Sequence, residues 1–275
     1  MKLAIVAITD GGRTLARKLA RNMTGATLLT NDRKVSTTVA DNWHRFDGFI
    51  FIMAAGIVVR TIAPLLQHKH HDPCVVVLDE KGRHVISLLS GHLGGGNQLT
   101  RKIASITCGQ PVITTASDIL GLVPLDLWAS TQNLYIEDQE KLTAASSILV
   151  NRGTLTLYAD IEMSNMPEEF NVTAKWEEAD IIVSHKDVYP EDATLFRPRN
   201  LVVGIGCNRH TPEIEFEESL NELLRDCSLS RSSIRNLASI DKKKDEVGLL
   251  AFGSRNRWSI DFFDKDSINK LKNLE

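Results

Sequence analysis

The sequence predicts an α/β fold built from mainly parallel-sheet lobes with flanking helices. Short apolar runs alternate with helical segments along the chain, and glycine-rich turns join several runs to the helices that follow. At the N-terminus, the apolar run 3–9 is followed by Gly11, Gly12 and a helical segment over 13–22. Because strands connected through helices pair in parallel by right-handed crossovers, this alternation predicts parallel sheets.

We expect residues 1–125 to form an N-terminal α/β domain. Its further elements are a strand at 48–53, a helix at 57–67 that Pro64 should kink or end, a β-hairpin of strands 75–78 and 84–88, a helix at 98–107 and a strand at 112–115.

We expect a middle α/β segment over 126–195 and a C-terminal α/β domain over 200–275. The middle segment has a helix at 138–151 that ends near Gly153, strands at 154–158 and 179–184, and a polar linker between Pro190 and Pro198. The C-terminal domain has a strand that runs into a glycine turn over 201–207, a short strand at 237–241, and helices at 213–225 and 265–274.

The composition excludes several classes of function. Of the 275 residues, 43% are hydrophobic and 24% are charged, and the net charge is −3. These values fit a globular chain and argue against non-specific nucleic-acid binding. The four cysteines have neither zinc nor redox-pair spacing, so we expect reduced thiols in a cytoplasmic protein. The apolar run 3–8 is too short for a secretory core, and no run approaches the roughly 18 residues of a membrane span.

The strongest local feature is the glycine-rich segment 90–97, which precedes a helix. Three consecutive glycines allow positive φ angles and leave backbone N–H groups bare. Those groups and the helix dipole form an anion site, with His92 beside it. A tight crossover with a packed histidine is the alternative. The predicted substrate-binding residues of this loop are Ser90, Gly94, Gly95, Gly96 and Asn97.

Two other glycine turns follow strands. Gly56 precedes Arg60, which can pair bidentately with a substrate carboxylate. Gly204 and Gly206 form a second predicted substrate-binding turn. Arg209 replaces the last glycine of the dinucleotide fingerprint there, so an NAD site is weakly supported.

The remaining candidates are charged or metal-binding side chains. The run 241–246 follows a strand end, where sites of α/β proteins gather, although a solvated loop is the usual interpretation. His68, His70 and His71 have no zinc-site spacing, so we predict no metal site. The chain has neither a G-x-S-x-G elbow nor a P-loop.

Several runs together resemble one known family. They are residues 54–60, 62–66, 72–73, 75–80, 86–95 and 111–118 in the N-terminal region, and 203–209 and 237–241 in the C-terminal region. Over most of the chain, this combination resembles the CbiG family of anaerobic cobalamin biosynthesis, the cobalt-precorrin-5A hydrolases.

The resemblance implies a reaction and a ligand. The family uses water to open the δ-lactone of cobalt-precorrin-5A and releases acetaldehyde, which gives cobalt-precorrin-5B and contracts the macrocycle. It implies no cofactor, since cobalt is carried by the tetrapyrrole substrate, and no nucleic-acid or membrane partner; a homo-oligomer is compatible with it. It also implies a C-terminal domain longer than the one that ends at residue 275.

Roles can be assigned on this basis. We predict His92 as the base that activates water, the Gly94–Gly96 amides as oxyanion donors, and Asp241 or Glu246 for later proton transfers. The acidic arms of the substrate suit the glycine turns and Arg60. We expect the substrate to lie between two lobes, at the ends of parallel strands.

Three alternatives remain. They are a non-catalytic tetrapyrrole-binding or carrier protein of the same pathway, an S-adenosylmethionine-dependent methyltransferase and a dinucleotide-dependent oxidoreductase.

Overall fold

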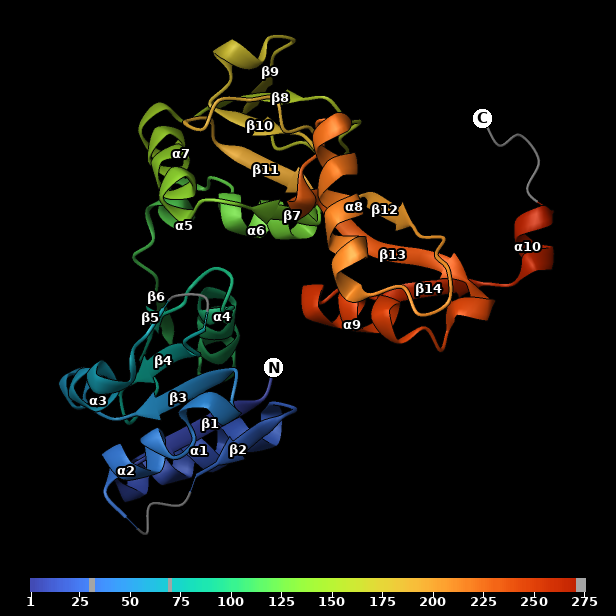
Figure 1. The fold of residues 1–275 in the computed structure, drawn as a ribbon. Helices are drawn as coiled ribbons and strands as arrows, with labels where there is room; N and C mark the ends of the chain where they lie inside the picture. The colour runs from blue at the N-terminus through green and yellow to red at the C-terminus, as the bar shows by residue number, and fades with distance from the viewer. Residues whose placement is uncertain (30–32, 69–70, 271–275) are drawn as a thin grey trace. The chain divides into compact units, whose positions relative to one another are not determined.

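The computed structural model describes residues 1–29, 33–68 and 71–270, and it confirms the α/β fold class (Figure 1). Its contacts divide the chain into two units, Met1–Leu127 and Trp128–Glu275. The first unit holds a six-stranded sheet, and the second holds a five-stranded and a three-stranded sheet. The division into domains 1–125, 126–195 and 200–275 stays a prediction.

The first unit alternates strands and helices. In chain order its elements are β1 (Leu3–Ala7), α1 (Asp10–Asn22), β2 (Ala26–Leu28), α2 (Val35–Ala40), β3 (Gly48–Ile52), α3 (Ala55–Ile62), β4 (Cys74–Leu78), β5 (His84–Leu89), α4 (Gly96–Thr107), β6 (Gln110–Val112), α5 (Ala116–Leu120) and the start of α6 (Leu125–Thr131). The sheet order is β2-β1-β3-β4-β5-β6. Every neighbouring pair is parallel except β4 and β5, which form the predicted hairpin.

The sheet of the first unit is buried between two layers of helices. Strands β1, β3 and β4 are buried at every residue, as expected for a sheet covered on both faces. On one face, Leu19 of α1 and Ile103 of α4 belong to a core cluster with Ile50. On the other face, Val58 of α3 clusters with Phe49. Burial of each such side chain contributes about 1.5–3 kcal/mol, so these two layers stabilise the sheet.

Two predicted elements of this unit end differently from expectation. The helix predicted at 57–67 stops at Ile62 and continues as a 3₁₀ turn over Ala63–Leu65, where Pro64 cannot donate a helical hydrogen bond. The strand predicted at 112–115 ends at Val112. Thr115 instead precedes α5 as its N-cap residue.

The second unit contains two sheets. Its elements are β7 (Leu134–Ile136), α7 (Gln139–Arg152), β8 (Leu155–Ala159), β9 (Phe170–Val172), β10 (Ile181–Val183), β11 (Leu195–Pro198), β12 (Leu201–Gly204), α8 (Glu213–Asp226), β13 (Ile234–Ile240), α9 (Val247–Asn256), β14 (Ile260–Phe263) and α10 (Lys265–Asn269). The five-stranded sheet has the order β7-β11-β10-β8-β9, and only β7 is antiparallel to its neighbour. The three-stranded sheet, β12-β13-β14, is entirely parallel.

The linker predicted between Pro190 and Pro198 is wrong at its C-terminal end. Strand β11 pairs on both sides within the five-stranded sheet, and its Arg197 is only 1% exposed. Arg197 lies 3.1 Å from carboxylate oxygens of both Glu137 and Asp187. An arginine is rarely buried, so its presence made this strand look like part of a polar linker. Its two carboxylate partners allow it to be buried.

Two further comparisons concern single helices. The predicted helix 265–274 corresponds to α10, and residues 271–275 lie outside the described ranges. Among the described residues, no helix has the length and apolar character needed to cross a bilayer.

Close packing at Gly248 gives a test of the C-terminal sheet and its helices. A Cβ atom on Gly248 of α9 would overlap the carbonyl oxygen of Thr211. The variant Gly248→Ala should therefore lose about 1–3 kcal/mol of stability, which calorimetry would detect as a lower Tm. The matched control is Gly206→Ala, because a Cβ there meets no atom within 4 Å. Equal Tm values for the two variants would contradict this packing.

Candidate functional site

The hairpin determines where the glycine-rich loop 90–97 lies. Strand β5 runs against β4, and Leu89 at the end of β5 pairs with Val75 near the start of β4. The loop therefore lies at the amino-terminal edge of β1, β3 and β4. In Figure 1 the arrowheads of β3 and β4 point toward α3, at the opposite edge. The glycine-rich loop and the turn that contains Gly56 therefore lie at opposite edges of this sheet.

The loop folds back on its own backbone. The amides of Gly95 and Gly96 donate to the carbonyl oxygens of His92 and Ser90 at 2.8 and 3.1 Å, and the Asn97 amide donates to Gly91 at 2.9 Å. A Cβ on Gly94 would lie 2.6 Å from the Ser90 carbonyl oxygen, so this glycine permits a close backbone approach.

These bonds correct the prediction of three oxyanion donors. Gly95 and Gly96 are already satisfied within the loop, and Gly94 is the one member of the triplet whose amide donates to no described residue. The role of Ser90, Gly94, Gly95, Gly96 and Asn97 in substrate binding stays a prediction.

His92 lies between two carboxylates. Its Nε2 atom is 3.1 Å from Oδ2 of Asp118, and its Nδ1 atom is 3.6 Å from Oδ1 of Asp126. Ser117 places its hydroxyl 3.4 Å from Nε2. The ring is 21% exposed, so it is partly shielded but reachable from solvent. A histidine held at one nitrogen by a carboxylate is an arrangement that can accept a proton from water.

Asp118 connects His92 to two further donors. Arg101 donates to its Oδ1 atom at 2.6 Å, and Asn97 donates through Nδ2 to Oδ2 at 2.7 Å. Partial burial alone would raise the pKa of Asp118, but hydrogen bonds from Arg101 and His92 outweigh it and hold the pKa below its ordinary value. Asp118 is therefore an ionised hydrogen-bond acceptor at neutral pH.

Asn97 has one polar atom without a partner. Its side chain is 4% exposed, and its Oδ1 atom accepts no hydrogen bond from the described part of the chain. Because Nδ2 donates to Asp118, the amide cannot be flipped without placing Oδ1 against a carboxylate. This oxygen is therefore a buried acceptor that the described residues leave unsatisfied.

Gly56 and Arg60 lie at the opposite edge of the same sheet. Gly56 is in the first turn of α3, and Arg60 donates to its carbonyl oxygen at 3.2 Å. A five-residue strand separates this edge from the His92 loop by about 17 Å, at 3.3 Å per residue. The role of Gly56 and Arg60 in substrate binding stays a prediction. They lie apart from the His92 cluster, which consists of His92, Asn97, Arg101, Ser117, Asp118 and Asp126.

The carboxyl-terminal edge also holds a pocket of about 500 Å³. Apolar side chains from the ends of β1, β3 and β4 form most of its wall, and Asp79, Glu80 and His84 complete it. None of these three polar residues was singled out from the sequence.

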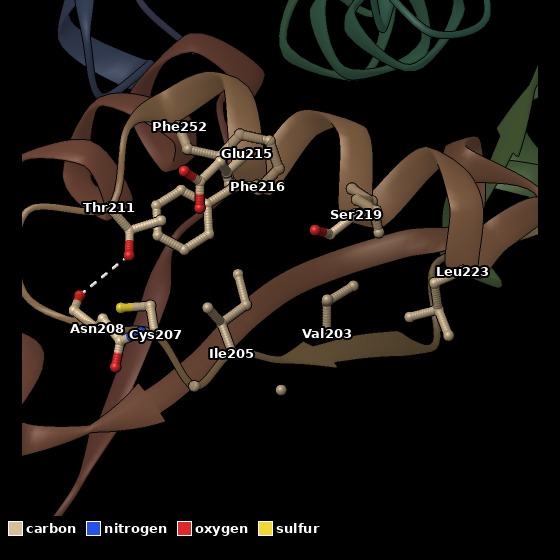
Figure 2. Close-up of a pocket in the computed structure, with 13 residues that line it drawn as sticks. Val203, Ile205, Cys207, Asn208, Thr211, Glu215, Phe216, Ser219, Leu223 and Phe252 are labelled. Atoms are coloured by element: carbon tan, nitrogen blue, oxygen red, sulfur yellow. Dashed lines mark hydrogen bonds between the residues drawn. The ribbon is translucent and has the colours of Figure 1, made fainter.

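Gly204 and Gly206 line a separate pocket in the second unit. The pocket has a volume of about 330 Å³ and lies between the end of β12 and helix α8. Figure 2 shows Val203 and Ile205 on one side and Phe216 and Ser219 on the other. Because a Cβ at either glycine meets no atom within 4 Å, this backbone is accessible. Substrate binding here stays a prediction.

The charged run after β13 packs on the loop after β12. Arg209 donates to Oδ1 of Asp245 at 2.5 Å, and the His210 amide donates to Oε1 of Glu246 at 2.7 Å. The two loops therefore gather at one edge of the sheet, as expected for parallel strands.

Glu246 is 3% exposed, so its carboxylate fastens the loop that contains His210. Asp241 begins a 3₁₀ turn at the end of β13. Both residues belong to the second unit, and their catalytic roles stay predictions.

The sequence analysis missed Asp118, Asp126, Arg101 and Ser117. A signal for Asp118 and Ser117 was available, because Thr115-Ala116-Ser117-Asp118 has the polar composition of a helix start after a strand. Asp126 and Arg101 offered no such pattern. Within the described ranges, no three His, Cys, Asp or Glu side chains form a metal-binding group; His70 lies outside those ranges.

The fold and the His92 cluster define an α/β protein with a histidine–aspartate pair suited to activating water. Three family models match most of the chain: "Cobalamin synthesis G N-terminal" matches residues 37–118, "Cobalamin biosynthesis central region" matches 123–198, and "Cobalamin synthesis G C-terminus" matches 201–275.

Full-length relatives agree with these matches. The chain is 32% identical to the cobalt-precorrin-5A hydrolase of Priestia megaterium, over 98% of this chain and 81% of the relative. It is also 32% identical to that of Salmonella typhimurium, over 98% and 84%. A solved cobalamin biosynthesis protein G homologue from Sulfolobus solfataricus shares 21% identity, with a TM-score of 0.44 over 98% of this chain and 82% of the other. The chain belongs to the CbiG family of cobalamin biosynthesis, and the predicted family is confirmed.

The lowered pKa of Asp118 predicts how stability depends on pH. Its ionised form stabilises the folded chain fully above the unfolded carboxyl pKa of about 3.9, and this contribution is lost as the pH falls through the lower folded-state pKa. Asp118→Asn should lower the free energy of unfolding by about 1–3 kcal/mol at pH 7, as measured with denaturant. The difference from wild type should shrink below pH 4.

A control distinguishes this network from an ordinary surface pair. Asp10 pairs with Arg13 at 3.1 Å but is 99% exposed, so Asp10→Asn should change stability little at either pH. An Asp118→Asn difference that stays constant from pH 7 to pH 3 would contradict the assignment.

Proposed function

We propose that this chain has the activity of its curated relatives and hydrolyses cobalt-precorrin-5A to cobalt-precorrin-5B. Water adds to the δ-lactone carbonyl, the ester C–O bond breaks, and a carboxylic acid and an alcohol form. The alcohol then loses its proton, a carbon–carbon bond breaks, and acetaldehyde leaves. The electron pair stays on the macrocycle, which takes up a proton.

The observation that carries the proposal is the hydrogen bond between His92 and Asp118. In the proposed reaction, His92 is the base that removes a proton from the attacking water. Asp118 stabilises the positive charge that the imidazole ring gains. Both residues lie in the region that matches the N-terminal family model.

The surroundings of this pair suit a large ring with acidic arms. Leu93, Ile119 and Leu120 adjoin His92 and Asp118 in sequence and are exposed. Their apolar surface can contact the face of a macrocycle, and the Gly94 amide can donate to a carboxylate or an oxyanion.

The reaction consumes water and is redox-neutral overall, because the electron pair of the broken carbon–carbon bond stays on the macrocycle, so it needs no redox cofactor. Cobalt enters as part of the substrate. We place the reaction in the cytoplasm, where the free thiols of Cys74, Cys108, Cys207 and Cys227 stay reduced.

Acetaldehyde release tests the proposal. The substrate is incubated anaerobically with the protein, acetaldehyde is trapped, and the tetrapyrrole product is identified by mass spectrometry. His92→Gln should lower kcat by roughly 10²–10⁴-fold, because the proton acceptor is lost.

His44→Gln is the control, since His44 lies in the same unit, is exposed and lines neither pocket described above. Its turnover should equal wild type. Near-normal turnover of His92→Gln would remove His92 from the mechanism. Tight binding by the wild type without acetaldehyde would favour the non-catalytic carrier.

A further inference from the structure

Four side chains form a hydrogen-bond network on the Nε2 side of His92: Asp118, Asn97, Arg101 and Ser117, whose hydroxyl lies 3.4 Å from Nε2. Asp118 contacts Nε2 through Oδ2, and the same oxygen accepts from Asn97. Arg101 fixes the other carboxylate oxygen of Asp118. A carboxylate with two such donors is held in place, and in its ionised form it can only accept hydrogen bonds.

The Nδ1 side of the ring has a different geometry. Asp126 places Oδ1 3.6 Å from Nδ1, which is too long for a direct hydrogen bond. The same oxygen accepts from the Leu127 amide at 2.8 Å, which holds it in place. One water molecule at about 2.8 Å from each atom could donate one proton to Nδ1 and the other to Asp126.

We propose that Asp118 is a positioning residue that keeps the His92 proton on Nε2, so that Nδ1 and Asp126 together bind and activate the water that attacks the lactone. Because Asp118 only accepts, Nε2 must donate, and the neutral ring then has its lone pair on Nδ1. Water transfers one proton to Nδ1 as its oxygen bonds to the lactone carbonyl carbon. His92 becomes an imidazolium between two carboxylates, and its Nδ1 proton later goes to the alkoxide that leaves the opened lactone.

This inference rests on the proposed function for its water and lactone, but the tautomer can be tested without substrate. Nitrogen-15 NMR of labelled protein distinguishes a protonated from an unprotonated imidazole nitrogen, and His92→Gln identifies the His92 signals. In the neutral ring of the wild type, the proton should be on Nε2. In Asp118→Asn, the new amide can donate to Nε2, and the proton should move to Nδ1, on the side of the ring that faces the Asp126 carboxylate.

Kinetics supply the second readout. Asp118→Asn should lower kcat by roughly 10²–10⁴-fold with less than about threefold change in KM, because the wrong nitrogen carries the proton. Asp118→Glu should recover part of this loss. Arg101→Gln should lower kcat by a smaller factor than Asp118→Asn, because Asp118 keeps its contact with Nε2 but loses the hydrogen bond that fixes its Oδ1 atom. Among the described residues, the charged groups that face His92 are Asp118 and Asp126. Arg101 influences the ring indirectly, through its ion pair with Asp118.

Asp180→Asn is the matched control for the loss of a partly buried aspartate. Asp180 is 16% exposed and pairs with Arg152, which is 63% exposed; the values for Asp118 and Arg101 are 13% and 54%. Its kcat should equal wild type. Thermal melts show whether Asp118→Asn folds, and Arg101→Gln keeps the test valid if it does not.

The outcomes separate the two proposals. A wild-type proton on Nδ1, or an Asp118→Asn kcat within threefold of wild type, would overturn the inference while leaving the hydrolase intact. Absence of acetaldehyde from the wild type would overturn the proposed function, and the NMR result would then stand as a property of the His92 pair.

Discussion

The antiparallel pairing of β4 with β5 is the constraint on which the arrangement of the first unit depends. A single reversed strand carries the chain back to the amino-terminal edge of the sheet before the glycine-rich loop begins. Helix α4 then starts from that edge and packs on the same face as α1. The reversal thus separates the histidine loop from the α3 turn and makes two distinct edges available to a ligand.

Around His92, at the amino-terminal edge of the sheet, a partly buried carboxylate is balanced by a positive charge. Arg101 compensates the negative charge of Asp118, so the carboxylate can stay ionised although burial opposes it. Asn97 is almost fully buried and fixes the same carboxylate, which leaves its own carbonyl oxygen unsatisfied. An unsatisfied buried acceptor costs stability, so this loop is less stable than one that satisfied every polar group internally.

Sequence patterns predicted much of the fold because the first unit follows simple rules. Continuous apolar strands, glycine turns and a hairpin signal gave the sheet and its helices. The strand containing Arg197 was missed because its buried charge is stabilised by carboxylates distant in sequence.

The site was only half predictable. His92 and Asn97 stood out beside three glycines, but their partner Asp118 is more than 20 residues away and is brought in by tertiary packing. The glycines suggested bare amides, whereas two of them are used to close the loop. The sequence did predict the hairpin. Because β5 runs antiparallel to β4, the loop that follows β5 and contains His92 lies at the amino-terminal edge of the sheet.

We infer that the macrocycle binds around His92, at the amino-terminal edge of the sheet in the first unit. Backbone hydrogen exchange, followed by mass spectrometry with and without cobalt-precorrin-5A on the inactive His92→Gln protein, tests it directly. The account predicts that substrate slows exchange in residues 90–97 and 115–120. Slowed exchange confined to residues 53–60, at the opposite edge, would contradict it.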